Sequence, residues 1–241
     1  MERKKRLGPS LPNRRTIQSE QKRRLILKVA TEVFAEGGFG ETTIAHISQK
    51  AKIAEGSIYH YFKNKEDLLF SIPEERMENF LSGLHENLEG VKGALNKLRK
   101  LIWYHLYFYE KNRDYVLILL QNIRQKPRFT STRAYQLIRD FSRLVAQIIE
   151  EGKEEGVIRA DIDSKILRDA LLGAIEHITI RGSILGRVPT LTDAAAPLYD
   201  IFLSGIQVQA GTVTIPLEEF LQLKKAREAK KIRRPRETEP N

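Results

Sequence analysis

Residues 42–65 read TTIAHISQKAKIAEGSIYHYFKNK, and the expected fold is built outward from this stretch. The hydroxyls of Thr42 and Thr43 can cap free backbone N–H groups at the start of a short helix. The apolar residues of this helix recur at helical spacing, at Ile44, Ile47 and Ala51. A tight connection then leads to a second short helix, which is predicted to run from about residue 54 to residue 62.

The second short helix is predicted to have an apolar face and an aromatic outer face. The residues expected to point to the core are Ile53, Ile58 and Phe62. Tyr59, His60 and Tyr61 are left to face outward, and exposed aromatic side chains are unusual without a partner. Two short helices, a tight turn and a hydrogen-bonding outer face form the helix-turn-helix pattern. In that pattern the second helix enters the major groove of DNA.

The wider stretch ETTIAHISQKAKIAEGSIYHYFKNKEDLL, residues 41–69, resembles the DNA-binding signature of the TetR (tetracycline-repressor-like) family of bacterial regulators. The matching landmarks, in order, are Thr43, Ile47, Ala51, Ile53, Gly56, the 59–62 run, Lys65 and Leu68. Two positions depart from the family pattern. Lys52 replaces a turn glycine and offers a phosphate contact, whereas Ala54 replaces a serine cap, at a cost of about 1 kcal/mol.

The composition favours a helical DNA-binding protein. The 241 residues are 41% hydrophobic and carry a net charge of +10, which favours polyanionic partners. There is no cysteine, so disulfides, thiolate metal sites and cysteine nucleophiles are excluded. No apolar run reaches the roughly 18 residues of a membrane span, and no signal peptide is recognised, so the cytoplasm is the expected location. Strand-like alternation is nearly absent, and an all-α fold is expected.

The chain is expected to have four parts. Residues 1–17 form a disordered basic arm, and residues 18–64 form the helix-turn-helix domain. Residues 65–210 form a ligand-binding and dimerisation domain, and residues 211–241 form a C-terminal extension with a basic tail. Whether either tail contacts DNA or is simply solvated stays open. The DNA-binding head should open with a long helix from Ser19 to the glycines at 37–38.

The helix that follows the head is expected to start at Asn64 and to be kinked or broken at Pro73. A hinge there would link the head to the core. Lys65 is a cation at the positive end of this helix, a small cost that a phosphate would offset. Further helices are predicted over residues 94–109, 115–123, 131–155, 164–185 and 190–208, with Gly156 ending the third of them.

The family resemblance implies a set of DNA contacts. Thr43, Tyr61 and Lys65 match the phosphate clamps. The best candidates for base contacts are Ser57, Tyr59 and His60. Gly56 would allow close backbone approach, Ala45 would touch a thymine methyl, and Lys52 adds a cation.

The resemblance also implies a homodimer that reads a palindromic operator, with heads about 34–36 Å apart. The last two core helices would form the dimer interface. Its expected residues are Leu171, Leu172, Ala174, Ile175, Ile178, Ile184, Leu198, Ile201, Phe202 and Ile206.

A small effector is expected to release the operator. The aromatic helix suggests a long apolar group, and Arg124, Lys126 and Arg128 suggest an anionic one. The core also resembles TetR-type repressors of fatty-acid degradation, which respond to acyl-coenzyme A. The candidate effector-site residues, of which the polar ones are expected to be buried, are Tyr104, Tyr107, Phe108, Gln121, Arg124, His177 and Arg181, with Glu176 beside them. Core packing is the alternative role for each.

Other functions are less well supported. The five histidines are scattered, and no nucleophile, metal cluster or phosphate-binding glycine loop is recognised, so neither an enzyme nor a cofactor is expected. A regulator gated by a protein partner is the first alternative. A general architectural DNA binder is the second, and it would show strong salt dependence with little sequence preference.

Overall fold

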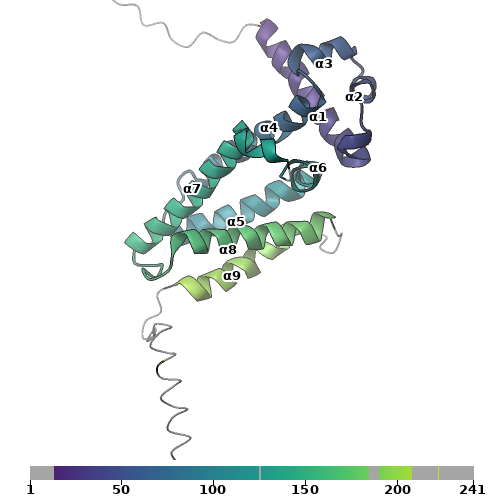
Figure 1. Cartoon of the computed structure of the whole chain (residues 1–241). Coiled ribbons are helices and arrows are strands. Elements are labelled where there is room, and N and C mark those ends of the chain that lie inside the picture. The colour runs from purple at the N-terminus through teal and green to yellow at the C-terminus, as the bar shows by residue number, and fades with distance from the viewer. Residues whose placement is uncertain (1–13, 125, 185–189, 208–221, 223–241) are drawn as a thin grey trace, which may run out of the picture. The chain divides into compact units, whose positions relative to one another are not determined.

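The computed structural model describes residues 14–124, 126–184, 190–207 and 222. Within these ranges the chain is helical, with a single antiparallel bridge between Ile158 and Gln207, which confirms the all-α fold (Figure 1). The α-helices are α1 (Arg14–Glu41), α2 (Ile44–Ala51), α3 (Glu55–Tyr61), α4 (Lys65–Leu88), α5 (Ala94–Lys111), α6 (Arg113–Ile118), α7 (Arg133–Glu154), α8 (Ser164–Thr179) and α9 (Ala195–Ile206). Shorter helical turns lie at Leu119–Ile123, Pro127–Ser131, Ile180–Ile184 and Leu191–Ala194.

Helix α1 is longer than the sequence suggested. It begins at Arg14, so residues 14–17 belong to a helix and not to the expected arm, and Ser19 is not its cap. It bends where the glycine pair was expected to end it, because Gly38 has φ 74° and ψ 160°, and it continues to Glu41. A positive φ is open to glycine at little steric cost, so Gly38 permits this bend.

The two short helices lie where the spacing placed them. Thr43 is the N-cap of α2, and its hydroxyl accepts a hydrogen bond from the backbone N–H of His46 at 3.1 Å. Lys52 ends α2 in the left-handed conformation, with φ 55°, which explains why a glycine suits this position. Ala54 opens α3 without a side-chain cap.

Helix α4 runs through Pro73 to Leu88 as one helix, so the expectation of a break at the proline is wrong. Its start is secured reciprocally: the Asn64 side chain accepts from the N–H of Asp67 at 2.8 Å, and the Asp67 carboxylate accepts from the N–H of Lys63 at 2.9 Å. Figure 1 shows α4 leading from the head helices to the core helices, and it packs against α1, α5 and α7. The two regions are therefore joined by one continuous helix.

The core is filled with aromatic side chains around α4 and α5. Phe80 of α4 lies 4.9–5.6 Å, centroid to centroid, from the rings of Tyr104, His105, Phe108 and Phe141. Tyr104 lies against Gly83, where an added Cβ would be 2.0 Å from its hydroxyl oxygen.

Glycine also permits close packing at the far end of α7. A Cβ on Gly152 would lie 2.5 Å from Cδ1 of Ile158 and 3.0 Å from Cβ of Ala94. The start of α5 is therefore packed tightly against α7. Gly156, at φ 70°, is in the left-handed conformation expected just after α7.

The remaining core boundaries shift by a few residues. The predicted 115–123 helix is α6 followed by the π-helical turn Leu119–Ile123, and the predicted 164–185 helix is α8 followed by the π-helical turn Ile180–Ile184. The arm at residues 1–13 and the extension at residues 211–241, with the basic tail, lie outside the described ranges apart from residue 222. In the described part of the chain, no helix is both long and apolar enough to cross a membrane.

Candidate nucleic-acid interface and core cavity

Helix α3 has one buried side and one exposed side. Ile58 is fully buried, whereas Tyr59 is 54% exposed and His60 is exposed beside it. Tyr61 differs from the expectation, because it is half-buried and its hydroxyl accepts from Ser19 Oγ at 3.3 Å. The outer surface of α3 therefore presents Tyr59 and His60, with Tyr61 leaning towards α1.

The other predicted DNA contacts surround this surface. Thr43, Ala45, Lys52 and Gly56 are exposed, and a Cβ added to Gly56 would meet nothing within 4 Å. Ser57 is half-buried and its hydroxyl oxygen accepts from Lys22 Nζ at 3.3 Å. All of these residues belong to the surface formed by α2, α3 and their caps, where amide donors of the α2 N-terminus also lie.

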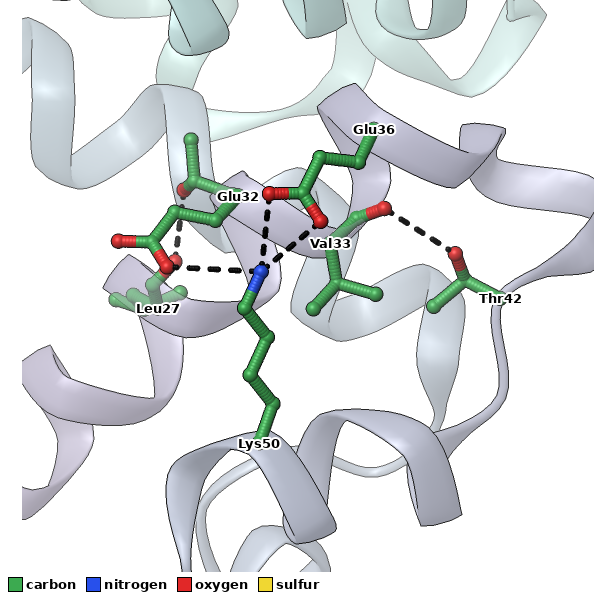
Figure 2. Close-up of polar contacts among 7 residues, drawn as sticks. Leu27, Glu32, Val33, Glu36, Thr42 and Lys50 are labelled. Carbon is green, nitrogen blue, oxygen red and sulfur yellow. Dashed lines mark hydrogen bonds and ion pairs between the residues drawn. The ribbon is translucent and has the colours of Figure 1, made fainter.

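Ion pairs and the contacts of one hydroxyl group hold α2 against α1. Figure 2 shows the Lys50 ammonium between two acids of α1, 3.0 Å from each carboxylate oxygen of Glu36 and 3.9 Å from Glu32. The Thr42 hydroxyl donates to the carbonyl of Gly38 at 2.7 Å. It also lies 3.5 Å from the carbonyl of Val33, the contact drawn in Figure 2. These contacts fix the angle at which α2 leaves α1.

Lys65 lies at a junction of the head. Its ammonium donates to the carbonyl oxygens of Phe39 at 2.8 Å, Gly40 at 3.1 Å and Thr42 at 2.8 Å. The same nitrogen is 4.5 Å from the centroid of the Phe39 ring. The cation at the start of α4 is thus compensated by carbonyl groups of the protein.

The core contains a small cavity of about 50 Å³ between α4, α5, α7 and α8. Its walls are mostly apolar and aromatic, and the lining residues are Met77, Phe80, His105, Tyr109, Arg124, Ile138, Phe141, Ser142, Leu172 and Glu176. Arg124 and Glu176 form an ion pair at its partly exposed side. The guanidinium is therefore neutralised by a group that a ligand anion could replace.

Two buried polar atoms in this region have no partner among the described residues. They are Nδ1 of His105, which lines the cavity, and the hydroxyl of Tyr115 from α6. Burial, with a smaller contribution from Arg124, lowers the pKa of His105 from 6.5 to about 3, so its ring is neutral. Burial raises the pKa of Tyr109 to about 12, and Tyr109 keeps its proton. Unpaired buried polar groups are costly, so the unpaired Nδ1 of His105 marks the cavity as a site for a hydrogen-bonding occupant.

The structure separates the predicted effector residues. Arg124 lines the cavity, but it is exposed, as are Tyr107, Gln121, His177 and Arg181, so the expectation that these five are buried is wrong. Tyr104 and Phe108 are buried and pack on Phe80, as the core-packing alternative proposed.

The other basic residues near Arg124 are directed elsewhere. Lys126 lies over the Phe39 ring at 4.8 Å, and Arg128 pairs with Glu66 at 3.4 Å. The basic cluster expected to bind an anion is therefore reduced to Arg124 at the cavity. The other two cations join the core to α1 and α4.

Sequence reasoning missed His105, Tyr109 and Tyr115. His105 continues the apolar series Leu98, Leu101, Phe108 at helical spacing, and this pattern could have marked it as a buried polar group. Larger clefts are open at the surface, including a groove of about 710 Å³ between α5 and α9 that contains Trp103. In the described residues, no three His, Asp or Glu side chains are placed to hold a metal ion.

The chain is similar to known bacterial regulators over most of its length. A family model described as bacterial regulatory proteins, tetR family, matches residues 26–72, and one described as YsiA-like protein, C-terminal region, matches residues 73–205. The fatty acid metabolism regulator protein of Bacillus subtilis is 25% identical over 189 residues, which cover 78% of this chain and 97% of that protein. The HTH-type transcriptional repressor NicS of Pseudomonas putida is 33% identical over 156 residues, covering 61% and 71%.

A solved structure has the same fold. The transcriptional regulator FadR from Bacillus subtilis, in complex with stearoyl-CoA, superimposes with a TM-score of 0.70 at 25% identity. The match covers 76% of this chain and 99% of that one. Both the head and the core are therefore included in the similarity.

Proposed function

The chain belongs to the TetR family of bacterial regulatory proteins, and from this premise we propose that it is a repressor released from a palindromic operator by an acyl-CoA-like effector. The family consists of DNA-binding transcriptional regulators, so the regulatory role itself is established by membership. The observation that carries the rest is the pairing of an exposed aromatic helix in the head with a small, mostly apolar cavity in the core that is lined by the unpaired Nδ1 of His105.

Helix α3 is proposed to read bases through Tyr59, His60 and Ser57. The exposure of Tyr59 and His60 on a helix anchored by Ile58 supports this role. Thr43 and Tyr61 are proposed to bind phosphates on either side of α3. Gly56 and Ala45 then offer close approach to the duplex, and Lys52 adds a charge.

The proposed dimer interface uses the outer faces of α8 and α9. Leu171, Ile175, Leu198 and Ile206, which the sequence assigned to the interface, are buried within the protomer instead. The outward apolar residues include Ile166, 68% exposed, and Ile201, 70% exposed, and they border one apolar cleft. Exposed apolar surface of this kind is expected to be covered by a second copy of the chain.

The effector is proposed to place a hydrogen-bonding carbonyl near His105 and an anionic group at Arg124. Arg124 is the cation that lines the cavity, while His105 and Tyr109 are neutral there. The aromatic and aliphatic walls suit an acyl chain. The similarity to a fatty acid metabolism regulator, and to a FadR structure that contains stearoyl-CoA, supports this class of effector.

The cavity is smaller than the effector that we propose for it. Pockets for drug-sized ligands usually hold roughly 300–1,000 Å³, compared with the cavity of about 50 Å³ here. An acyl chain must therefore part the helices that close the cavity. Because one wall is α4, which continues into the head, the effector would favour a different head position from the one that binds DNA.

The direct test is release of operator DNA by acyl-CoAs of increasing chain length. We expect long-chain acyl-CoA to dissociate the complex in fluorescence anisotropy, and free coenzyme A to have no effect. Native mass spectrometry should find one acyl-CoA per protomer. Operator binding that no acyl-CoA changes would favour gating by a protein partner. Equal binding to all sequences would favour an architectural role.

A pair of variants tests the ion pair at the cavity. Arg124→Gln removes the proposed anion contact and should weaken acyl-CoA binding, by about tenfold or more, as for the loss of a charged hydrogen bond. Glu176→Gln frees the guanidinium from its competing carboxylate and should strengthen the same binding. Changes of the same sign in both variants would contradict the proposed competition. Isothermal titration calorimetry with stearoyl-CoA measures both.

A further inference from the structure

We propose that Lys65 is a positioning residue for DNA reading, and that it acts by holding the turn between α1 and α2 and not by binding a phosphate. This inference rests on the proposed function, because it concerns how the head meets DNA. It replaces the phosphate contact that the family resemblance suggested for this residue. The observations that carry it are the hydrogen bonds of its ammonium and the position of the turn that receives them.

All the hydrogen-bonding capacity of Lys65 is used inside the protein. An ammonium has three N–H donors, and three carbonyl oxygens, those of Phe39, Gly40 and Thr42, lie within 2.8–3.1 Å of Nζ. The ring of Phe39 lies against the same nitrogen at 4.5 Å. A phosphate oxygen could approach closely only by displacing one of these carbonyls.

The turn needs this cation. The last carbonyls of a helix have no amide partner within it, and basic side chains often satisfy them. Here α1 is already bent at Gly38, so the carbonyls of Phe39 and Gly40 lie beyond its regular part. Lys65 binds both and also binds the carbonyl of Thr42, which lies between α1 and α2.

The contact reaches the DNA-binding surface through one peptide bond. Thr42 precedes Thr43, the N-cap of α2 and a proposed phosphate ligand. Lys65 is the first residue of α4, which continues into the core. The position of the first turn of α2 is therefore tied directly to the start of α4. A head without this contact keeps its DNA-binding side chains, but their positions are less well fixed.

The neighbouring acids do not provide an alternative partner. Asp67 accepts from the backbone N–H of Lys63, and Glu66 pairs with Arg128. At the positive end of α4, the carbonyl cluster is what compensates the Lys65 charge. The arrangement predicts that operator binding depends on the geometry of the hydrogen-bond donor at position 65 and not only on its charge.

The test compares Lys65→Gln and Lys65→Arg for operator binding over a range of salt concentrations. Gln lacks the charge but keeps two donors, whereas Arg keeps the charge in a planar fork that cannot direct three donors to converging carbonyls. We expect both variants to bind the operator roughly tenfold more weakly. The slope of log affinity against log salt should remain that of the parent, because no phosphate contact is lost.

A phosphate contact would give a different pattern. Lys65→Gln would then reduce the magnitude of the salt slope by roughly two for a dimer, and Lys65→Arg would retain affinity. Either result overturns the proposal. Lys52→Gln is the matched comparison, since Lys52 is exposed on the same head and is proposed to add a charge near DNA.

Hydrogen exchange provides a readout without DNA. In Lys65→Gln, we expect faster amide exchange over residues 42–47 and unchanged exchange in α7. Unchanged exchange in the turn would overturn the positioning role even if the parent bound no operator. Absence of sequence preference in the parent would instead contradict the proposed function, so the two failures are distinguishable.

Discussion

The head and the core of this protein present their candidate sites in opposite ways. In the head, Tyr59 and His60 stand on the outside of a short helix whose inner side is anchored by Ile58. In the core, the buried His105 and the half-buried Tyr109 line a cavity that is smaller than its proposed ligand. The head is prepared for a large rigid partner, whereas the core must change shape before it can accept a small flexible one.

This difference explains how one chain can respond to a ligand. A preformed surface binds DNA with little rearrangement, so its affinity depends on where the head is held. A closed core binds its effector only with a change in helix packing. That change can move α4. The four predictions below test this contrast, and they are ordered by expected effect.

Acid should destabilise the core through His105. Its folded pKa of about 3 lies below the unfolded value of 6.5, so the unfolded chain binds more protons between these pH values. Its contribution is complete above pH 6.5 and is lost as the pH falls, by about 3 kcal/mol at pH 4.5. Denaturant unfolding of the parent and of His105→Phe, each measured above pH 6.5 and at pH 4.5, gives the difference. His46→Gln, on the exposed side of α2, is the control and should keep the full pH dependence.

Added volume should be tolerated in the head and not in the core. Gly152→Ala places a methyl group against Ile158 and Ala94, and we expect a loss of about 2 kcal/mol in unfolding free energy. Gly56→Ala meets nothing within 4 Å, so the head should lose no stability. Gly56→Ala should nevertheless weaken operator binding if the backbone of α3 approaches DNA. Equal stability losses in the two variants would contradict the contrast in packing.

Removing a base reader should change sequence preference and leave the core unaffected. Tyr59→Ala is expected to weaken operator binding by about 1.4 kcal/mol, or tenfold, with little change for unrelated DNA. Tyr61→Ala should weaken binding to both kinds of DNA, as expected for a phosphate contact. Competition anisotropy with operator and unrelated duplexes separates these results. Acyl-CoA binding, measured by calorimetry, should be the same in both variants and the parent.

Replacing Lys52 with glycine should have opposite effects on the stability of the head and on its affinity for DNA. Lys52→Gly relieves a left-handed backbone and should raise the unfolding free energy by about 1 kcal/mol. The same change removes a cation and should lower DNA affinity. Lys52→Ala loses the charge but keeps the strained backbone, so it should show only the second effect. If both variants unfold alike, the conformation at residue 52 is not strained.

The head was largely predictable because its signals are local. A capping hydroxyl at Thr43, apolar residues three and four apart, and a reciprocal cap around Asn64 placed α2, α3 and the start of α4 to within one or two residues. The role of Lys65 was not predictable, because its three acceptors are backbone atoms more than twenty residues away. The side-chain types in a sequence do not show where backbone carbonyl oxygens without an amide partner lie close together.

The core site was harder to predict because four helices build it. Arg124 was found from its charge, but its partner across the cavity and the burial of His105 depend on how α5 and α8 cross. The spacing of apolar residues within one helix does not determine how two helices cross. The unbroken passage of α4 through Pro73 was missed for the same reason, since Pro73 is buried and α4 packs against other helices of the protein.

The close contact between Tyr104 and Gly83 provides a way to redesign the sensor. The phenol fills the space that a side chain at position 83 would need, and its ring stacks on Phe80, which forms part of the cavity wall. Shortening Tyr104 would release volume beside that wall without touching Arg124. Biosensor libraries that vary positions 83 and 104 together could thus admit bulkier inducers while retaining the native operator.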